Sequence, residues 1–530
     1  MFLRTTKAKG KTYLSIVENY YDKGRTRQKN IASLGCLDKF KDTHQLEHIA
    51  KALLAFCKER KTIFDVSSLQ EKSRKKWGAV RVFRKLWNTF GLDAIFKKIT
   101  EKKKSTFDFF SAVFLMLLDR LCAPQSKLAS YNGQDKYFDI KKNELQHLYR
   151  ALDILADKKD TLEEYLFYKN VSLFNMTVDV CLYDVTTLYF ESVRKDELKK
   201  FGYSKDCKFN EVQIVLGLLV DLEGSPIGFD IYPGNTYEGH TFSDALDTLK
   251  NRFKINRVII VGDQGMMSKN NIQVTKDKEY SYIVGSRLKA KSDVLKKEIL
   301  DKRRYKKLSM NVDDTEEIVK YREIEIDNEK ILCTWSKKRA EKDKADRERL
   351  IEKAKKMLEA KTPITSRRGA LKYINASITH EPTLDEKKIR EDEQWDGFYG
   401  IQTNCTGYDS RMILNYYHDL WRVEESFRIF KTHLETRPIF HWTPQRIKGH
   451  LVLCFIAFLL ERTLEGILKK KKIEYSPQKI RKALDELELS EIDLEGQTFF
   501  LRSKIEGLAN TILRALNIPI PPTISQTQDF

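Results

Sequence analysis

The sequence lacks the cysteine and histidine patterns that mark disulfide-bonded or zinc-binding domains. Its eight cysteines are scattered over 530 residues, and no two of them form a Cys-x-x-Cys pair. A zinc knuckle and a disulfide framework are therefore not predicted, and a reducing cytosol fits this composition best. The nine histidines also show no metal-ligand spacing, so the sequence gives no sign of a zinc site.

Long apolar segments are missing as well. The longest apolar run, residues 451–460, has ten residues, whereas a membrane-spanning helix needs about 20. Residues 1–10 lack the apolar core of a signal peptide. No glycine-rich turn meets a helix start with Lys-Ser or Lys-Thr, so a phosphate-binding loop is not predicted. We therefore expect a cytoplasmic protein that is neither secreted nor embedded in a membrane.

Positive charge is abundant and unevenly placed. The chain has 96 Lys and Arg against 76 Asp and Glu, a formal net charge of +20. The first 110 residues hold 26 basic and 11 acidic residues, a net +15, so three quarters of the excess lies in the first fifth of the chain. A basic end of this kind indicates a polyanionic partner, with nucleic acid first. The alternative is a basic surface that only aids solubility.

The first 175 residues are predicted to form a basic hairpin followed by helices. Residues 12–20 and 25–34 alternate like two strands joined by a turn at 22–24. Helical periodicity follows at 44–60, 78–98, 107–121 and 145–156.

Residues 178–290 change to a strand-rich pattern. Strands are expected at 179–190, 212–221, 225–232, 256–262 and 280–286, with helices at 239–252 and after 267. Three consecutive strands followed by helix–strand units predict a mixed α/β sheet. Later elements are expected as strands at 318–326, 330–336 and 398–403, and as helices at 340–360, 409–435 and 445–468.

Two aspartates stand out on the predicted strands. Asp184 lies inside the apolar strand CLYDVTTLYFE, against both strand preference and burial. Asp263 ends the apolar strand RVIIVGD, and strand ends are where α/β folds place ligand-binding groups. The structural alternatives are that Asp184 caps a bulge and that Asp263 caps the following helix.

A third carboxylate, Glu424, lies in the predicted helix 409–435. Apolar positions in this helix step by three and four residues, which is typical of a buried stripe. They are Ile413, Tyr416, Leu420, Val423, Phe427, Phe430 and Leu434. A second stripe lies one residue further round and contains Tyr417, Trp421, Glu424, Arg428, Lys431 and Glu435. Glu424 is thus expected at the border of the core, and the alternative is an exposed helix with ordinary i,i+4 ion pairs.

Taken together, two strand-borne aspartates and a later helix-borne glutamate form a carboxylate trio on a ribonuclease H-like sheet. Three oxygen ligands without histidine or cysteine favour Mg²⁺ or Mn²⁺ over zinc. Two such ions about 3.5–4 Å apart can activate a water or a 3′-hydroxyl and stabilise the leaving oxygen of a phosphodiester.

Several stretches of the sequence carry a family resemblance. They are FLRTTKAKGKTYLSIVENY at the start, YDVTTLYFES around Asp184, GLLVDLEGSPIGFDIYPGNT at 217–236, VIIVGDQGMMS around Asp263, and WRVEESFRIFKTHLETRPIFHW at 421–442. The sequence resembles bacterial insertion-sequence transposases of the DDE type, within the IS-four-like group. The resemblance covers most of the chain. It implies that Asp184, Asp263 and Glu424 are the catalytic, metal-binding triad.

The group has a four-residue signature on the last catalytic helix. A Tyr is followed three residues later by Arg, the Arg four residues later by Glu, and the Glu seven residues later by Lys. Tyr417, Glu424 and Lys431 fit it, and the resemblance implies DNA contacts for Tyr417 and Lys431. Leu420 stands where the arginine is expected. Arg428, one turn beyond Glu424, is interpreted as the substitute, because Arg422 points to roughly the opposite side of a regular helix.

The resemblance also implies a domain organisation. The expected parts are 1–75, a basic hairpin and helix region; 76–175, a helical DNA-binding region; 176–290, the first part of a ribonuclease H-like core; 291–395, a partly β insertion; 396–470, the second part of the core; and 471–530, a helical tail.

The function that follows is a DNA transposase. It would bind the terminal inverted repeats of its element, cut there, and join the 3′-hydroxyl strands to target DNA, with two Mg²⁺ or Mn²⁺ ions. Double-stranded DNA is the expected partner, a homodimer on DNA the expected assembly, and the nucleoid of a bacterial cytoplasm the expected location. The alternatives are an inactive, transposase-derived DNA-binding protein and a metal-dependent, structure-specific nuclease.

Overall fold

The computed structural model shows two compact units. One comprises residues 1–74, 490–501 and 522–530, and the other comprises 75–489 and 502–521. The structure describes residues 1–22, 24–41, 45–55, 69–101, 107–174, 178–202, 210–263, 268–312, 315–326, 328–360, 368–377, 380–436, 439–494 and 496–526.

The first unit begins with a three-stranded antiparallel sheet in the order β1-β2-β3. Its elements are β1 (Phe2–Ala8), β2 (Lys11–Asp22) and β3 (Arg25–Cys36), followed by the helices α1 (Leu37–Lys41) and α2 (Gln45–Ala55). The predicted hairpin is therefore present as β2 and β3. The sequence analysis missed β1, whose residues are all exposed and therefore lack the alternating apolar pattern of a half-buried strand. Part of the helix expected at 44–60 lies outside the described residues.

A second small sheet has the order β18-β17-β16-β4. Its strands are β4 (Gln70–Lys76), β16 (Glu488–Leu494), β17 (Gln497–Arg502) and β18 (Ile524–Ser525). An ion pair joins Lys72 Nζ to Asp493 Oδ2 at 2.5 Å. The sequence analysis predicted only a helical tail here, because the hairpin of β16 and β17 is too polar to give a clear strand pattern.

The helical part of the second unit packs around one apolar helix. Its helices are α3 (Gly78–Phe90), α4 (Leu92–Thr100), α5 (Phe109–Cys122), α6 (Lys127–Asn132), η2 (Gln134–Lys136), α7 (Leu145–Asp157), α8 (Lys159–Phe174), α16 (Pro444–Lys470), α17 (Pro477–Asp485) and α18 (Gly507–Ala515). Helix α16 contacts α3, α5 and α7, and its residues 447 and 449–461 are buried. The longest apolar run of the sequence is thus a core helix. Among the described residues, no helix is long and apolar enough to cross a membrane.

Helices α7 and α16 approach closely at Gly449. A Cβ atom at Gly449 would lie 2.0 Å from the carbonyl oxygen of Leu152 in α7. We expect Gly449→Ala to lower the free energy of unfolding by about 1–3 kcal/mol, because the two backbones must separate. The matched control is Gly466→Ala on the same helix, where a Cβ meets nothing within 4 Å. That variant should gain up to about 1 kcal/mol of helix propensity. Equal denaturant midpoints for both variants would contradict the close approach.

The second unit also holds a nine-stranded sheet in the order β10-β11-β12-β15-β9-β8-β5-β6-β7. Five of its strands are β5 (Val180–Tyr189), β6 (Gln213–Val220), β7 (Pro226–Pro233), β8 (Ile259–Gly262) and β9 (Ser281–Gly285). β5, β6 and β7 form an antiparallel meander, whereas β8 is parallel to both β5 and β9. This order, third-second-first-fourth-fifth in the chain, is the ribonuclease H-like arrangement and confirms the predicted fold class.

The segment after residue 290 extends the same sheet. β10 (Lys306–Val312), β11 (Thr315–Ile326) and β12 (Glu329–Trp335) lead to β15 (Phe398–Thr403), which pairs with β9. The other elements of this segment are η4 (Leu288–Ala290), α11 (Asp293–Leu300), η5 (Lys302–Arg304), α12 (Lys337–Glu359), η6 (Gly369–Tyr373), β13 (Ile374–Ser377), β14 (His380–Leu384) and α13 (Glu386–Glu393). The strongly charged segment therefore contributes both strands and the expected long polar helix.

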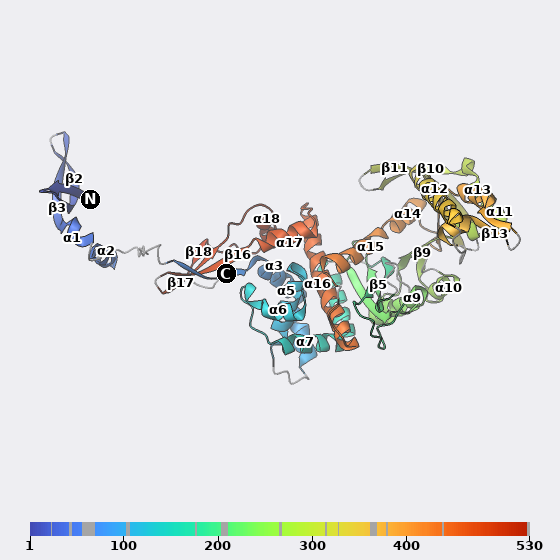
Figure 1. The fold of residues 1–530 in the computed structure, drawn as a ribbon, viewed down its shortest axis with the longest axis horizontal. Coiled ribbons are helices and arrows are strands. Elements are labelled where there is room, and N and C mark those ends of the chain that lie inside the picture. The colour runs from blue at the N-terminus through green and yellow to red at the C-terminus, as the bar shows by residue number, and fades with distance from the viewer. Residues whose placement is uncertain are drawn as a thin grey trace. The chain divides into compact units, whose positions relative to one another are not determined.

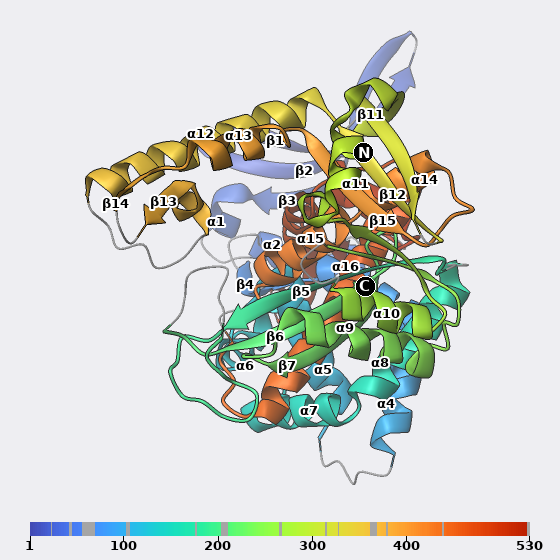
Figure 2. The ribbon, with the colours of Figure 1, turned by 90° about the vertical axis from the view of Figure 1, so that its right-hand side faces the viewer.

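Helices cover both faces of the ribonuclease H-like strands (Figures 1 and 2). α9 (Glu238–Asp247), continued by the π-helix η3 (Thr248–Arg252), contacts β6, and α10 (Lys269–Asp277) contacts β9. On the opposite face, α16 contacts β7, where the rings of Phe229 and Phe455 lie 5.1 Å apart. The same opposite face meets α15 (Trp421–Arg428), which contacts β5 and β6.

Candidate active site

Asp184 and Asp263 occupy matching positions on adjacent parallel strands. The ladder between β5 and β8 pairs Val180 with Ile259 and ends at the pair of Leu182 with Val261. Two residues further along each strand direction stand Asp184 and Asp263. Neighbouring strands lie about 4.8 Å apart, so this register brings Asp184, in the middle of β5, close to Asp263, which directly follows β8.

The strand alternation places Asp184 on the face that α15 covers. Its neighbours Tyr183 and Val185 belong to the core cluster that contains Phe242 of α9. Because successive side chains of a strand alternate between faces, Asp184 points to the other face, where it is half-buried. The ladder of β5 with β6 is continuous through Asp184, opposite Leu218, so the bulge-capping alternative is wrong.

Asp263 follows β8 directly and is exposed. The helix-capping alternative is wrong, because the N-cap of α10 is Ser268, whose Oγ accepts a hydrogen bond from Asn271 N at 3.2 Å. Residues 264–267 of the motif lie outside the described part of the chain. Asp263 thus stands at the carboxyl end of a central parallel strand.

A tyrosine pair lies near Asp263. The hydroxyl groups of Tyr399, on β15, and Tyr417, on α14 (Ser410–His418), are hydrogen-bonded to each other. Burial raises the pKa of Tyr417 above its ordinary value, and Tyr399 and the charge of Asp263 raise it further. The guanidinium of Arg339 lies 4.2 Å from the ring centre of Tyr399. The signature tyrosine is therefore close to Asp263 but engaged with a neighbouring tyrosine.

The predicted helix 409–435 is not continuous. It consists of α14, a turn at 419–420, α15, and the π-helix η7 (Ile429–His433). The apolar stripe hides this break, because Val423, Phe427 and Phe430 remain buried beyond it. The correction matters for side-chain directions, since a spacing of 3.6 residues per turn holds only within α15.

Glu424 lies on α15 and is exposed. Its predicted place at the border of the core is therefore wrong, and the neighbouring Trp421 is also 42% exposed. The other side of α15 is anchored. Ser426 Oγ donates to Gly224 O at 3.4 Å in the β6–β7 turn, and Arg462 of α16 pairs with Glu425 at 3.1 Å. These contacts hold α15 against the meander and leave Glu424 accessible.

The predicted basic residues differ in their surroundings. Arg428, at the end of α15, is 66% exposed, and its nearest recorded acid is Glu425 at 4.0 Å. Lys431 lies in the π-helical turn, so its direction cannot be taken from the regular helix. Arg422 is tied to Asp419 at 3.0 Å in the turn between α14 and α15.

These surroundings predict an order of importance for DNA cleavage. Arg428→Ala and Lys431→Ala should lower the cleavage rate at saturating protein more than Arg422→Ala does, since phosphate contacts near the reacting centre are worth several kcal/mol. Arg422→Ala, which removes the bond to Asp419 and the contact with the Trp421 ring, should act on stability or general DNA affinity. If Arg422→Ala is the most damaging and Lys431→Ala is neutral, the assigned face of the helix is wrong.

The three carboxylates fit a hard divalent ion by their chemistry, and the sheet register joins two of them. Among the described residues, however, no three His, Cys, Asp or Glu side chains are close enough together to hold a metal ion. The register of β5 and β8 brings Asp184 close to Asp263, and Glu424 lies on α15, which contacts β5 and β6. The structure does not join all three in one coordination group.

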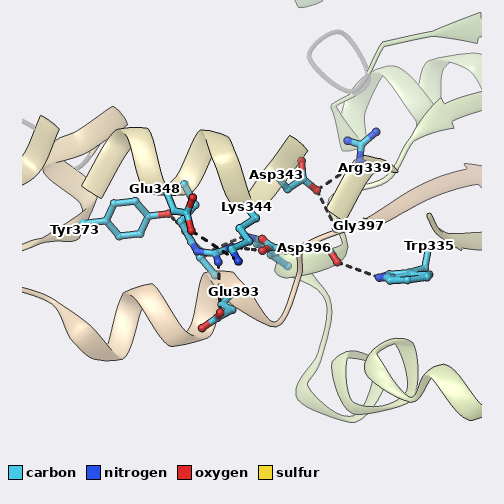
Figure 3. A network of polar contacts seen from close by, with 12 residues as sticks. Trp335, Arg339, Asp343, Lys344, Glu348, Tyr373, Glu393, Asp396 and Gly397 are labelled. Carbon is cyan, nitrogen blue, oxygen red and sulfur yellow. Dashed lines mark hydrogen bonds and ion pairs between the residues drawn. The ribbon is translucent and has the colours of Figure 1, made fainter. Parts of the chain in front are cut away.

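A cleft of about 590 Å³ adjoins Tyr399 and is lined by residues that the sequence analysis did not single out. Its basic lining side chains are Arg287, Lys289, Arg339, Arg347 and Lys372, and its acidic ones are Asp343, Asp346, Asp392 and Asp396. Figure 3 shows a network of polar contacts that includes Asp343 and Asp396 of this lining. The buried Arg347, which also lines the cleft, pairs with Asp396 and with Glu393, the latter at 3.4 Å. Only the tertiary structure brings these residues together, because they lie about 50 positions apart.

The strand order defines a ribonuclease H-like domain. Residues 178–460, which are 283 of the 530, match the family described as Transposase DDE domain. Residues 3–66 match the family described as IS1634 family transposase, N-terminal domain. The chain belongs to the DDE transposase family, which confirms the resemblance seen in the sequence.

Several solved chains match this chain. One of them is the Mos1 transposase paired-end complex with left transposon end, which matches with 12% identity over 44% of this chain and 76% of that chain, at a TM-score of 0.15. A similarity this low carries no argument, and the fold assignment rests on the strand order. A search of curated proteins found no match.

Proposed function

We propose that the protein is the transposase of an insertion sequence. It binds the terminal inverted repeats of its element, cleaves DNA at the ends and transfers the 3′-hydroxyl strands to target DNA. The observation that carries this proposal is the register of β5 and β8. This register supports a site that joins Asp184 and Asp263, on a chain that belongs to the DDE transposase family.

Asp184, Asp263 and Glu424 are proposed to hold two Mg²⁺ or Mn²⁺ ions. DDE transposase domains generally use divalent metal ions, and three carboxylates without histidine or cysteine suit these hard ions. When bound, such a pair activates the attacking water or 3′-hydroxyl and stabilises the leaving oxygen. For this role, α15 must bring Glu424 toward the two aspartates when DNA is bound.

The basic side chains of the site are proposed to position the DNA strand. Arg428 and Lys431 lie after Glu424 in the chain and supply positive charge for the scissile phosphate. Tyr417 lies near Asp263 and is proposed to contact the strand from α14. Arg339 and Arg287 of the cleft extend this positive surface toward the segment after residue 290.

The proposal also covers DNA binding by the N-terminal three-stranded sheet and the assembly of two copies of the protein on DNA. The three-stranded sheet carries exposed Lys and Arg side chains and matches an N-terminal domain of a transposase family. We propose that it contacts double-stranded DNA at the element ends. Joining two ends requires two copies of the site, so the active form is proposed to be a homodimer on DNA at the bacterial nucleoid.

The experiment is cleavage of a labelled duplex that carries the terminal repeat found beside the gene. The proposal predicts Mg²⁺-dependent nicking at the repeat end, followed by strand transfer when target DNA is added. Binding without cleavage would favour the inactive DNA-binding alternative. Cleavage governed by branched structure rather than by the repeat sequence would favour the nuclease. Chelation of the metal should stop cleavage and spare binding.

A further inference from the structure

A basic pocket of about 280 Å³ lies where the segment after η7 meets the helical part of the second unit. It is lined by Arg120 of α5, Gln125, Lys127 of α6, Phe440, His441 and His450 of α16. None of these residues belongs to the carboxylate site. At roughly 30 Å³ per water molecule, the pocket has room for a small anion together with its hydration.

Several polar atoms at this basic pocket are buried without hydrogen-bond partners. Lys127 and His450 are each 3% exposed. Within the described part of the chain, Lys127 Nζ, Gln125 Nε2 and His450 Nδ1 have no hydrogen-bond partner. An unpaired buried ammonium is strongly unfavourable unless something compensates it. Of these atoms, Lys127 Nζ and Gln125 Nε2 are hydrogen-bond donors, so the cavity offers two unpaired donors to a ligand that accepts hydrogen bonds.

Asp119 only partly offsets the positive charge of the basic pocket: its charge raises the pKa of Lys127, which is nevertheless lowered. Its Oδ1 contacts Tyr137 at 2.9 Å and Lys136 at 2.8 Å, and its Oδ2 is buried without a hydrogen-bond partner among the described residues. Glu435, at the pocket lining, is exposed. Arg120 keeps its charge inside, with its Nη1 donating to the carbonyl oxygens of Leu434 and Glu435, each at 2.9 Å.

The titration of the lining groups reflects this positive interior. Burial lowers the pKa of Lys127 to about 7, and the charge of Arg120 lowers it further, while Cys454 and Asp119 act in the opposite sense. Burial lowers the pKa of His441 to about 3, with Lys127, Arg120 and Arg446 contributing. The pKa of His450 falls well below its ordinary value for the same reasons. An anion in the pocket would relieve this repulsion.

We propose that the basic pocket binds a phosphate group, supplied by a DNA strand. A phosphate oxygen accepts from Lys127 Nζ and Gln125 Nε2, while Arg120 balances the remaining charge. Phe440, 61% exposed at the lining, offers an apolar surface to the adjoining sugar or base. Arg120 also links the pocket to the end of the segment that carries Glu424. The DNA source rests on the proposed function, whereas the phosphate site does not.

The test compares Lys127→Met with Lys142→Met in the full-length protein. Lys142 has a side chain 76% exposed and serves as the matched control. Thermal unfolding is measured with inorganic phosphate and with sodium chloride at equal ionic strength. Phosphate should raise the melting temperature of the wild type and of Lys142→Met. Lys127→Met should lose this stabilisation, with phosphate affinity reduced about tenfold or more by calorimetry.

The phosphate-free melting temperature shows whether the variant still folds. Lys127→Met should melt no lower than the wild type, because it removes an unpaired buried charge. Gln125→Leu, which removes a second donor, should also weaken phosphate binding. Equal stabilisation of the wild type and Lys127→Met by phosphate would overturn the site, as would the lack of any phosphate-specific stabilisation of the wild type.

Phosphorus NMR then separates the two sources of phosphate. Bound inorganic phosphate should be released when an element-end duplex is added, as expected if a strand phosphate takes its place. Phosphate that stays bound in the DNA complex would overturn the DNA source and leave a site for the free anion. Because this readout involves no cleavage, a failure of the DNA source can be distinguished from a failure of the proposed cleavage activity.

Discussion

Replacing Asp184, Asp263 or Glu424 by alanine is expected to abolish DNA strand cleavage while end binding stays nearly unchanged. Loss of one metal ligand removes several kcal/mol of transition-state stabilisation. At about 1.4 kcal/mol per factor of ten, the rate should fall by about 10³-fold or more. Binding is spared because carboxylates repel the phosphates of DNA. Single-turnover cleavage of a labelled end in Mg²⁺, beside a mobility-shift assay, measures both quantities.

Glu425 supplies the matched control for this set. It is the next residue on α15 and pairs with Arg462 at 3.1 Å, so Glu425→Ala loosens the helix without removing a proposed ligand. We expect Glu425→Ala to keep most of its cleavage and to lose stability. If a triad variant retains near wild-type cleavage in Mg²⁺, that residue is wrongly assigned.

The second large expected effect is the salt dependence of DNA binding. Binding of the full-length protein to an element end should weaken steeply as salt rises, with a slope of about −0.9 in the log–log plot for each phosphate neutralised on duplex DNA. Substituting Lys7, Lys9, Lys11 and Lys29 by glutamine removes four exposed charges from the three-stranded sheet. The slope should become shallower by about 0.9 for each of these lysines that contacts a phosphate.

Full-length protein is the right material for that measurement. Helices α3 and α4, which begin at Gly78, belong to the second unit, and α3 packs against α5, α16 and α17. A fragment of residues 1–110 would therefore expose part of a core. A salt slope near zero, or a slope unchanged by the four substitutions, would contradict the role of the N-terminal sheet in binding DNA.

The strands that position the aspartates were predictable because they are buried. β5, β6, β8 and β9 consist mainly of buried residues, and their apolar runs, ended by turns or by Asp263, gave bounds within three residues of those observed. β1 was not predictable, because its residues are all exposed and it exists by pairing with β2. The sequence alone therefore indicates the core of the fold more clearly than its basic periphery.

The sequence predicted individual residues of the candidate site, but it did not predict how they are arranged in space. Periodicity indicated one helix through Glu424, whereas the structure breaks it at 419–420, since Val423 and Phe427 continue the apolar stripe after the turn. Tertiary packing creates the hydrogen bond between Tyr399 and Tyr417. It also places the guanidinium of Arg339 over the ring of Tyr399. No short-range pattern in the sequence encodes such contacts.

The central claim is that Asp184 and Asp263 bind metal directly, and metal rescue tests it best. A thiolate is a poor ligand for the hard Mg²⁺ ion and a more acceptable one for the softer Mn²⁺ ion. Cleavage by Asp184→Cys and Asp263→Cys, with the alanine variants as controls, is measured in each metal. The account predicts that the cysteine variants are inactive in Mg²⁺ and regain cleavage in Mn²⁺, while the alanine variants stay inactive in both. Cysteine variants with the same residual activity in both metals, or alanine variants rescued equally by Mn²⁺, would contradict it.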